Sequence, residues 1–248
     1  MLIDATTKNL PPGYLPQRTI NGLGLLLLPD KPIWIEVANV NNRITKKDFK
    51  FSISPDGNLQ GSFSIEYHGY AKHLERESID AKSSKSALET LANKFNIKKE
   101  SITVENLGDT EKPLRLTANF SGKNLHADAG TDIIFPFLFF ENTGSHPFQL
   151  EERAYPVFFG TPFAEQVRME ISIPQGWKFS HYPKSQNIRN RDGSVYSYQV
   201  EETGGKLIII TLITQPKAII ETRFYGFLKA FHHRIITLHN EKIIISPK

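Results

Sequence analysis

Histidine and carboxylate side chains are the groups that could do chemistry in this chain, because its 248 residues include no cysteine. The lack of cysteine excludes disulfides, thiolate nucleophiles and zinc sites built on thiolates. Eight histidines are present, but none belongs to the i, i+4 pair with a glutamate that zinc-dependent hydrolases place on one helix. His68 and His73 are five residues apart, while His232, His233 and His239 lie on or after the last expected helix. The spacing predicts no metal site.

Carboxylates offer a second chemistry, which is glycoside hydrolysis. Two acids acting on a sugar must face each other across a cleft at a separation of roughly 5 to 10 Å. The candidates are Glu66, Glu75, Glu151 and Glu152. Because charge clusters usually lie at the surface, we interpret Glu151 and Glu152 as a solvated strand end or as partners of Arg153. A glycan-processing enzyme is therefore one hypothesis, and it ranks third behind the two given below. It depends on whether these acids lie close together in the folded chain.

The sequence lacks the motifs of several other chemistries. It contains no G-x-S-x-G stretch of a serine hydrolase, and GLGLLLLP and TGGK lack the glycine spacing of a phosphate-binding loop. We therefore expect no cofactor. The formal charge of +4 comes from 30 basic and 26 acidic residues, and the nearest basic cluster is a loop with Lys184, Arg189 and Arg191. This pattern does not favour a nucleic-acid partner.

Aromatic side chains give a possible binding surface. Tyr67, Tyr70 and Trp177, together with Trp34 and Tyr182, could form a platform on which sugar rings stack. Phenylalanine-rich alternating strands more often supply a core, so this interpretation ranks second. It predicts a carbohydrate-binding β-sandwich module in which Tyr67, Tyr70 and Trp177 bind the ligand.

The elements that would position these groups are mostly strands. Residues 1–32 form an extended arm in this interpretation, because prolines and glycines interrupt every potential element. Alternation of apolar and polar side chains then predicts strands. These runs lie at 49–53, 63–67, 102–104, 114–120, 132–140, 167–173, 195–200, 206–214 and 242–246. Pro136 makes one of them an edge or bulged strand. Helical spacing covers 83–97 and again 216–235, where Pro216 would open the helix.

This pattern predicts a mainly β protein of the α+β class, with antiparallel, β-sandwich-like sheets and two packed helices. We expect residues 33–248 to form one domain, with a possible subdivision near position 145. The apolar run at 25–28 is far shorter than the roughly 20 residues of a membrane helix, so no membrane span is expected. The opening MLIDATTKNLPPGYLP shows no basic region followed by an apolar one, so no secretory signal is visible in it.

The opening LIDATTKNLPPGYLP resembles the last strand and exit segment of the transglutaminase-like fold in bacterial multidomain proteins. In that fold an aspartate in a D-A-T or D-P-T step completes a Cys-His-Asp triad, and Asp4 matches that aspartate. Its role would be to orient a histidine and to stabilise the charged imidazole beside a thiolate. This chain has neither the cysteine nor the upstream histidine-containing strand, so we expect no catalysis from Asp4 alone.

Six further pieces carry a resemblance over nearly the whole chain: NGLG (21–24), GSFSIEYHGYAKHLERE (61–77), VENLGDTEKPL (104–114), ERAYPVFF (152–159), ISIPQGWKFSHYP (171–183) and YGFLKAFHHRIITL (225–238). They resemble the uncharacterised C-terminal domain that follows the transglutaminase-like core in multidomain envelope proteins of Gram-negative gut bacteria. The resemblance implies a non-catalytic accessory or binding domain in the periplasm or cell envelope. Its partner would be a transglutaminase-like domain in cis, its ligand a peptide or glycan, and residues 1–32 the exit segment of that domain.

Overall fold

The computed structural model describes residues 6–7, 10–37, 41–80, 87–122, 131–138, 140–141 and 146–248. Strands make up 44% and helices 20% of these described residues. The mainly β class expected from the alternating sequence is confirmed.

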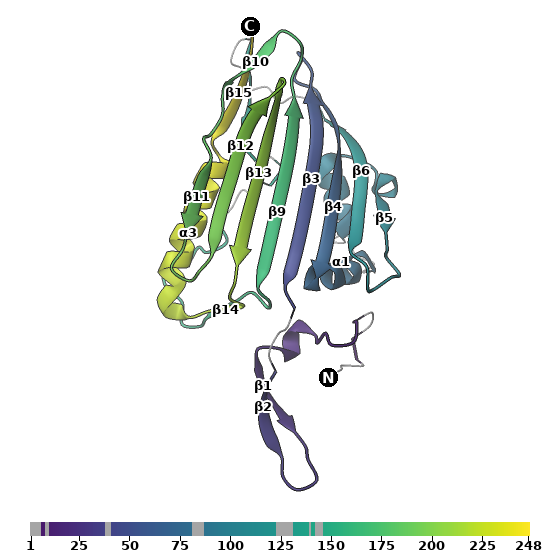
Figure 1. Ribbon diagram of the computed structural model, residues 1–248, viewed down its shortest axis with the longest axis vertical. Helices are drawn as coiled ribbons and strands as arrows, with labels where there is room; N and C mark the ends of the chain where they lie inside the picture. The colour runs from purple at the N-terminus through teal and green to yellow at the C-terminus, as the bar shows by residue number, and fades with distance from the viewer. Residues whose placement is uncertain are drawn as a thin grey trace.

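The centre of the fold is an eight-stranded sheet in the order β11, β12, β13, β9, β3, β4, β6, β5 (Figure 1). Its strands are β3 (Arg43–Ile53), β4 (Leu59–Gly69), β5 (Thr103–Glu105), β6 (Leu114–Gly122), β9 (Phe163–Ser172), β11 (Gln186–Arg189), β12 (Val195–Thr203) and β13 (Lys206–Gln215). Neighbouring strands are antiparallel except β3 and β9, which are parallel. This parallel pair joins strands from either side of position 145 into one sheet.

A second layer covers one face of the large sheet. It contains a three-stranded sheet in the order β10, β15, β7 together with helices that lie behind the large sheet in Figure 1. The bounds are β7 (Ile133–Pro136), β10 (Trp177–His181), β15 (Lys242–Pro247), α1 (Tyr70–Asp80), α2 (Ala87–Phe95) and α3 (Tyr225–His239). Pro136 ends an edge strand, where its missing N–H costs no ladder hydrogen bond. The arrangement is sandwich-like, as expected.

The core lies between the two layers and is built from every second residue of the large sheet. Phe49 and Phe51 point from β3 into the core, and the residues between them face the other side. The rings of Phe49, Phe95 of α2 and Phe140 meet at centroid distances of 5.8, 5.2 and 5.0 Å. Burial of one such side chain stabilises a fold by about 1.5–3 kcal/mol. The phenylalanine-rich alternation therefore holds α2 on the sheet.

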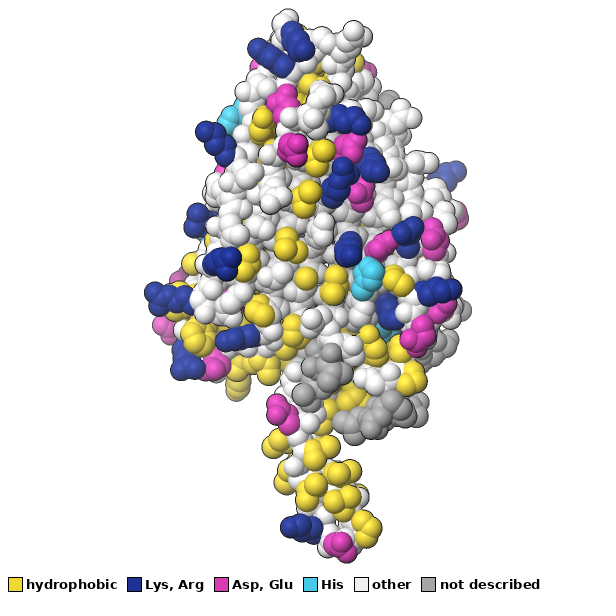
Figure 2. All heavy atoms as spheres, viewed as in Figure 1, with side chains coloured by type: hydrophobic (Ala, Val, Ile, Leu, Met, Phe, Trp, Pro, Cys, Tyr) yellow, Lys and Arg dark blue, Asp and Glu magenta, His cyan; other side chains and the backbone are white. Residues whose placement is uncertain are grey.

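The other face of the large sheet is seen in Figure 2, where uncharged polar side chains lie beside apolar ones and groups of opposite charge. In one such group Arg168 contacts Asp48 at 3.4 Å and Glu170 at 2.9 Å, and Lys206 contacts Glu170 at 2.7 Å. Hydrogen bonds from Lys206 and Arg168 lower the pKa of Glu170 to about 2. Because charged and polar side chains reach water here, we interpret this face as a solvated one. Such exposed ion pairs contribute little stability.

Helix α1 adds to the two expected helices. β4 ends at Gly69, whose φ of 57° lies in the left-handed region that side chains other than glycine rarely adopt. A Cβ at this position would lie 1.9 Å from the Asn42 carbonyl oxygen. Only glycine lets the chain turn in this space, and α1 begins at the next residue, Tyr70. No Ser, Thr, Asp or Asn precedes Tyr70, so the usual signal for a helix start is missing from the sequence.

Helix α3 begins later than expected, at Tyr225 and not at Pro216. Ile219–Ile220 instead forms β14, which pairs with β8 (Val157–Phe158), and the short helix η3 (Thr222–Phe224) follows. The backbone of 219–220 is therefore hydrogen-bonded to a strand about 60 residues earlier in the chain. Local spacing cannot reveal such a pairing, and the expected start of this helix is wrong.

The expected arm over residues 1–32 contains regular structure. A short helix, η1 (Gln17–Thr19), precedes β1 (Gly22–Leu26), which pairs with β2 (Ile33–Val37) as an antiparallel hairpin. The prediction that prolines and glycines interrupt every element is therefore wrong for residues 22–26. The predicted domain boundary after residue 32 falls inside this hairpin. A further short helix is η2 (Lys99–Ser101).

Two histidines of α3 are largely removed from water. Burial lowers the pKa of His232 and of His239 to about 4. His239 Nε2 lies 2.9 Å from the Tyr196 hydroxyl, which donates to the unprotonated nitrogen when the ring is neutral. Folding therefore favours the neutral form of both rings.

Stability is expected to fall as the pH drops from 6.5 to about 4. In this window the unfolded histidines bind protons and the folded ones do not, so protons favour the unfolded chain. His239→Gln should reduce the loss of unfolding free energy across the window by about 1–3 kcal/mol. Urea titrations at several pH values check this result, with His233→Gln on the exposed side of the same helix as the control. An unchanged pH dependence in His239→Gln would contradict it.

Candidate functional site

The β1–β2 hairpin is apolar on both of its faces. Residues directly opposite each other on antiparallel strands point to the same side. Leu25 is opposite Trp34 on one face, and Leu26 is opposite Ile33 on the other. Strands that are apolar on both sides are typical of sheets covered on both faces. The hairpin therefore has the composition of an internal part of a larger sheet.

Most apolar side chains of the hairpin are exposed to solvent. The exposed fractions are 70% for Leu23, 47% for Leu25, 76% for Leu27, 45% for Leu28 and 67% for Trp34. Figure 2 shows them as a narrow apolar projection below the body. A two-stranded hairpin without packing partners is marginally stable in water, and contiguous exposed apolar surface marks interaction sites. We therefore treat the hairpin as the candidate functional site.

The root of the hairpin is fixed to the body. The Asn21 side chain donates a hydrogen bond to the Gly160 carbonyl oxygen at 2.7 Å. The buried Tyr70 hydroxyl donates to the Leu15 carbonyl oxygen at 2.7 Å and accepts from the Leu15 N–H at 3.2 Å. The Tyr14 ring packs edge-on against the Tyr70 ring at 5.1 Å. These contacts hold the segment before β1 against the start of α1, so the hairpin leaves the body at a defined place.

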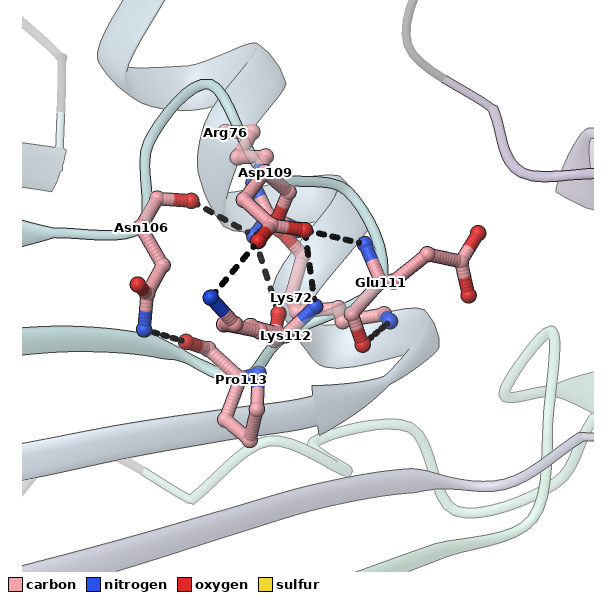
Figure 3. A network of polar contacts seen from close by, with 7 residues as sticks. All are labelled: Lys72, Arg76, Asn106, Asp109, Glu111, Lys112 and Pro113. Atoms are coloured by element: carbon pink, nitrogen blue, oxygen red, sulfur yellow. Dashed lines mark hydrogen bonds and ion pairs between the residues drawn. The ribbon is translucent and has the colours of Figure 1, made fainter.

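Helix α1, which carries Tyr70, is held in place by Arg76 (Figure 3). The Arg76 side chain is 2% exposed. Its guanidinium donates to the carbonyl oxygens of Lys72, Asn106, Leu107, Asp109 and Lys112. Burial lowers the pKa of Arg76, and the Asp109 carboxylate opposes that effect. Residues 106–112 thus wrap around the guanidinium and join their loop to α1.

The aromatic residues expected to bind sugars do not gather on one surface. Tyr70 is 2% exposed and lies under the segment before the hairpin. Tyr67 is half-buried on the core side of β4, where burial and Glu75 raise its pKa. Trp177 opens β10, at the opposite end of the molecule from the end of β4 (Figure 1). The three residues do not form a common stacking platform.

The four acids considered for glycoside chemistry lie at three separate places. Glu66 pairs with Arg115, which lowers the Glu66 pKa. Glu75 lies beside Tyr67 on the core side of the same sheet, and burial raises its pKa. Glu151 contacts Lys229 of α3 at 2.8 Å and not Arg153, and both Glu151 and Glu152 are exposed. This arrangement does not place them as a pair across a cleft.

Asp4, which matches the triad aspartate, lies outside the described residues. Within the part of the chain that is described, no three His, Asp or Glu side chains come together in a way that could hold a metal ion. In the same part, every helix is too short or too polar to cross a membrane. His68 contacts Glu66 at 3.3 Å, and His73 contacts Glu77 at 3.6 Å.

Residues 131–245 match the family model of a domain of unknown function with a solved structure, DUF3858. The match begins just before β7 and ends within β15. A search of curated proteins finds no match. Among solved structures, the chain is similar to a candidate protease from Parabacteroides distasonis, with 14% identity and a TM-score of 0.35. The similar region covers 40% of this chain and 19% of that protein, and a likeness of this extent carries no argument about chemistry.

Proposed function

We propose that this chain is a non-catalytic accessory domain of a longer transglutaminase-like envelope protein, and that its β1–β2 hairpin packs into the sheet of the transglutaminase-like domain. The observation that carries the proposal is a ribbon with apolar side chains on both faces, in which Trp34 is 67% exposed. Packing into a sheet would remove these side chains from water. It would also pair the free hydrogen-bonding groups along the two outer edges of the hairpin.

The identity of the partner rests on the sequence that precedes the hairpin. Asp4 matches the triad aspartate of the transglutaminase-like fold, and the hairpin follows shortly after it along the chain. A strand pair so near a triad residue would lie close to the catalytic sheet. The match of residues 131–245 to a domain of unknown function names no activity for this part of the chain.

In this proposal the chain contributes packing, and the chemistry resides elsewhere. The chain has no cysteine, so the thiolate of a Cys-His-Asp triad would come from the transglutaminase-like domain. The resemblance also supports a periplasmic or envelope location in a Gram-negative bacterium. The solvated face of the large sheet would remain accessible to a peptide or glycan ligand.

The isolated chain is expected to hydrolyse no peptide amides and to join no glutamine side chains to amines. Ammonia release from a glutamine-containing peptide, measured with and without a primary amine, checks the reaction at glutamine, and the appearance of new amino termini in the same peptide checks peptide-bond hydrolysis. Asp4→Ala serves as the matched variant. The proposal is supported if the unmodified chain and Asp4→Ala both react no faster than the peptide does without protein. Turnover that Asp4→Ala abolishes would make the chain itself an enzyme and would overturn the proposal.

A further inference from the structure

A cavity lies between the large sheet and α3. It has a volume of about 480 Å³ and is lined partly by apolar side chains such as Val167 and Ile213. A second hollow of about 310 Å³ shares Glu165, Ile213 and His232 with it and reaches Arg43. Sites for small molecules commonly have volumes of roughly 300–1,000 Å³. We call the two hollows together the α3 cavity.

The inner part of the α3 cavity contains a lysine between two carboxylates. Lys47 Nζ lies 2.5 Å from Glu141 and 3.2 Å from Glu165. Burial disfavours the Lys47 ammonium, but Glu165 and Glu141 outweigh this effect and raise the Lys47 pKa. Lys47 contacts Glu165 through Oε2, and the Glu165 side chain is 35% exposed. The other carboxylate oxygen of Glu165 can therefore accept hydrogen bonds from a ligand.

The outer part of the α3 cavity contains the Arg43 guanidinium, whose pKa burial lowers while the charge of Glu165 opposes that effect. Arg43 lies over the Phe163 ring at 5.0 Å. Its side chain makes no hydrogen bond or ion pair with the residues that the structure describes. A guanidinium presents donors in a planar fork that fits a carboxylate. Arg43 is thus available to bind an anionic group.

The two charged residues, Arg43 and Glu165, lie on neighbouring strands in a fixed register. Arg43 is paired with Phe163, and Thr45 with Glu165, in the parallel register of β3 and β9. Arg43 and Glu165 are therefore two residues apart along the strand direction and one strand apart, which separates their Cα atoms by roughly 8 Å. A cation and an anion so placed suit a small molecule that carries both charges close together.

The remaining polar groups leave the α3 cavity without net charge. Among the side chains that line it, Lys47 and Arg43 balance the two carboxylates, Glu141 and Glu165. Behind the lining, Lys94 contacts Glu141 at 3.3 Å and Glu75 acts on Lys47, which adds one charge of each sign. Burial keeps His232 and His239 neutral at pH 7, because it lowers the pKa of each to about 4. A neutral zwitterion fits such a cavity better than a net cation or anion, whose charge would be buried without compensation.

We propose that the α3 cavity binds an α-amino acid with an apolar side chain. Arg43 holds the α-carboxylate and Glu165 holds the α-ammonium at the outer end. The apolar side chain enters between the sheet and α3, against Val167, Ile213 and Ile235. This site does not involve the hairpin, so its test is independent of the test of the proposed accessory role.

Titration of the full chain with L-leucine tests the proposal, with the methyl signals of Ile213 and Ile235 followed by NMR. Saturable shifts of these signals are expected. L-leucinamide lacks the carboxylate and isocaproate lacks the ammonium. Each should bind about tenfold more weakly or worse, because each loses a charge-assisted hydrogen bond. No saturable shift with millimolar L-leucine would overturn the proposal, as would equal affinity for all three compounds.

Variants of the two charged residues give a second test. Arg43→Gln and Glu165→Gln should each weaken L-leucine binding by about tenfold or more. Lys46→Gln and Glu170→Gln change charges on the other face of the same two strands and should leave the affinity unchanged. Unweakened binding by folded Arg43→Gln and Glu165→Gln would overturn the assignment. If either variant unfolds, the three-compound series on the unmodified protein decides.

Discussion

Arg76→Met is expected to lower the free energy of unfolding by about 3–5 kcal/mol. The substitution removes the donor for five carbonyl oxygens, those of Lys72, Asn106, Leu107, Asp109 and Lys112. Hydrogen bonds to a charged group contribute about 1.5–3 kcal/mol each, but part of this is recovered when the exposed loop opens and water reaches the carbonyls. Chemical unfolding followed by circular dichroism gives the change, and faster proteolysis within residues 106–112 should accompany it.

Two further variants distinguish the loss of the Arg76 hydrogen bonds to the five carbonyl oxygens from a general effect of removing a positive charge. Arg115→Met removes an arginine that pairs with Glu66 at the surface of a nearby strand, and it should cost less than about 1 kcal/mol. Arg76→Lys keeps the charge but not the planar fork, so it should restore less than half of the lost stability. Equal losses in Arg76→Met and Arg115→Met would contradict the role given to the network.

Trp34→Ala is expected to weaken association with a separately supplied transglutaminase-like domain by about thirtyfold or more, because truncation of a central interface tryptophan commonly costs 2 kcal/mol or more. The same variant should change the free energy of unfolding by less than about 0.5 kcal/mol, since an exposed side chain contributes little to the fold. Calorimetric titration measures the first quantity and urea denaturation the second.

Tyr155→Ala is the matched control for Trp34→Ala, because Tyr155 is an aromatic residue of the body that is 79% exposed. It should leave both the association and the stability unchanged. Leu25→Ser, on the same face of the hairpin as Trp34, should weaken association in the same direction. If Tyr155→Ala weakens association as strongly as Trp34→Ala, the hairpin is not the docking surface.

The sequence predicts the large sheet well where apolar alternation is strict. Phe49, Phe51 and Ile53, then Phe63 and Ile65, lie on the core face as their period of two indicates. Asp56-Gly57 marks the turn between them, with Gly57 at a positive φ of 76°. These features depend on neighbours within the sequence, and local pattern is enough to find them.

Features that depend on distant partners could not be predicted in this way. The parallel pairing of β3 with β9 joins residues about 120 positions apart, and β14 pairs with β8 where a helix was expected. Arg76 offers no signal of its own, because its partners are backbone carbonyls whose positions depend on the fold. The α3 cavity could not be predicted for the same reason, because Arg43 and Glu165 come together only when β3 and β9 pair.

The sequence contains a pattern typical of this hairpin, which the prediction of an extended arm over residues 1–32 overlooked. Two apolar runs, GLGLLLL and IWIEV, flank the turn-forming PDKP, which is the pattern of a hairpin. Apolar residues at consecutive positions point to both faces of a strand, so they also indicate cover on both sides. The pattern of this chain does not identify what supplies that cover, because the cover depends on residues outside the hairpin.

Hydrogen–deuterium exchange of residues 22–37 tests the central claim most directly. It should be measured in this chain alone and in a longer polypeptide that also contains the transglutaminase-like domain. Docking into a sheet predicts fast exchange of the outward-facing amides of β1 and β2 in the chain alone, and strong protection of the same amides in the longer polypeptide. Equally fast exchange in both proteins would contradict the account.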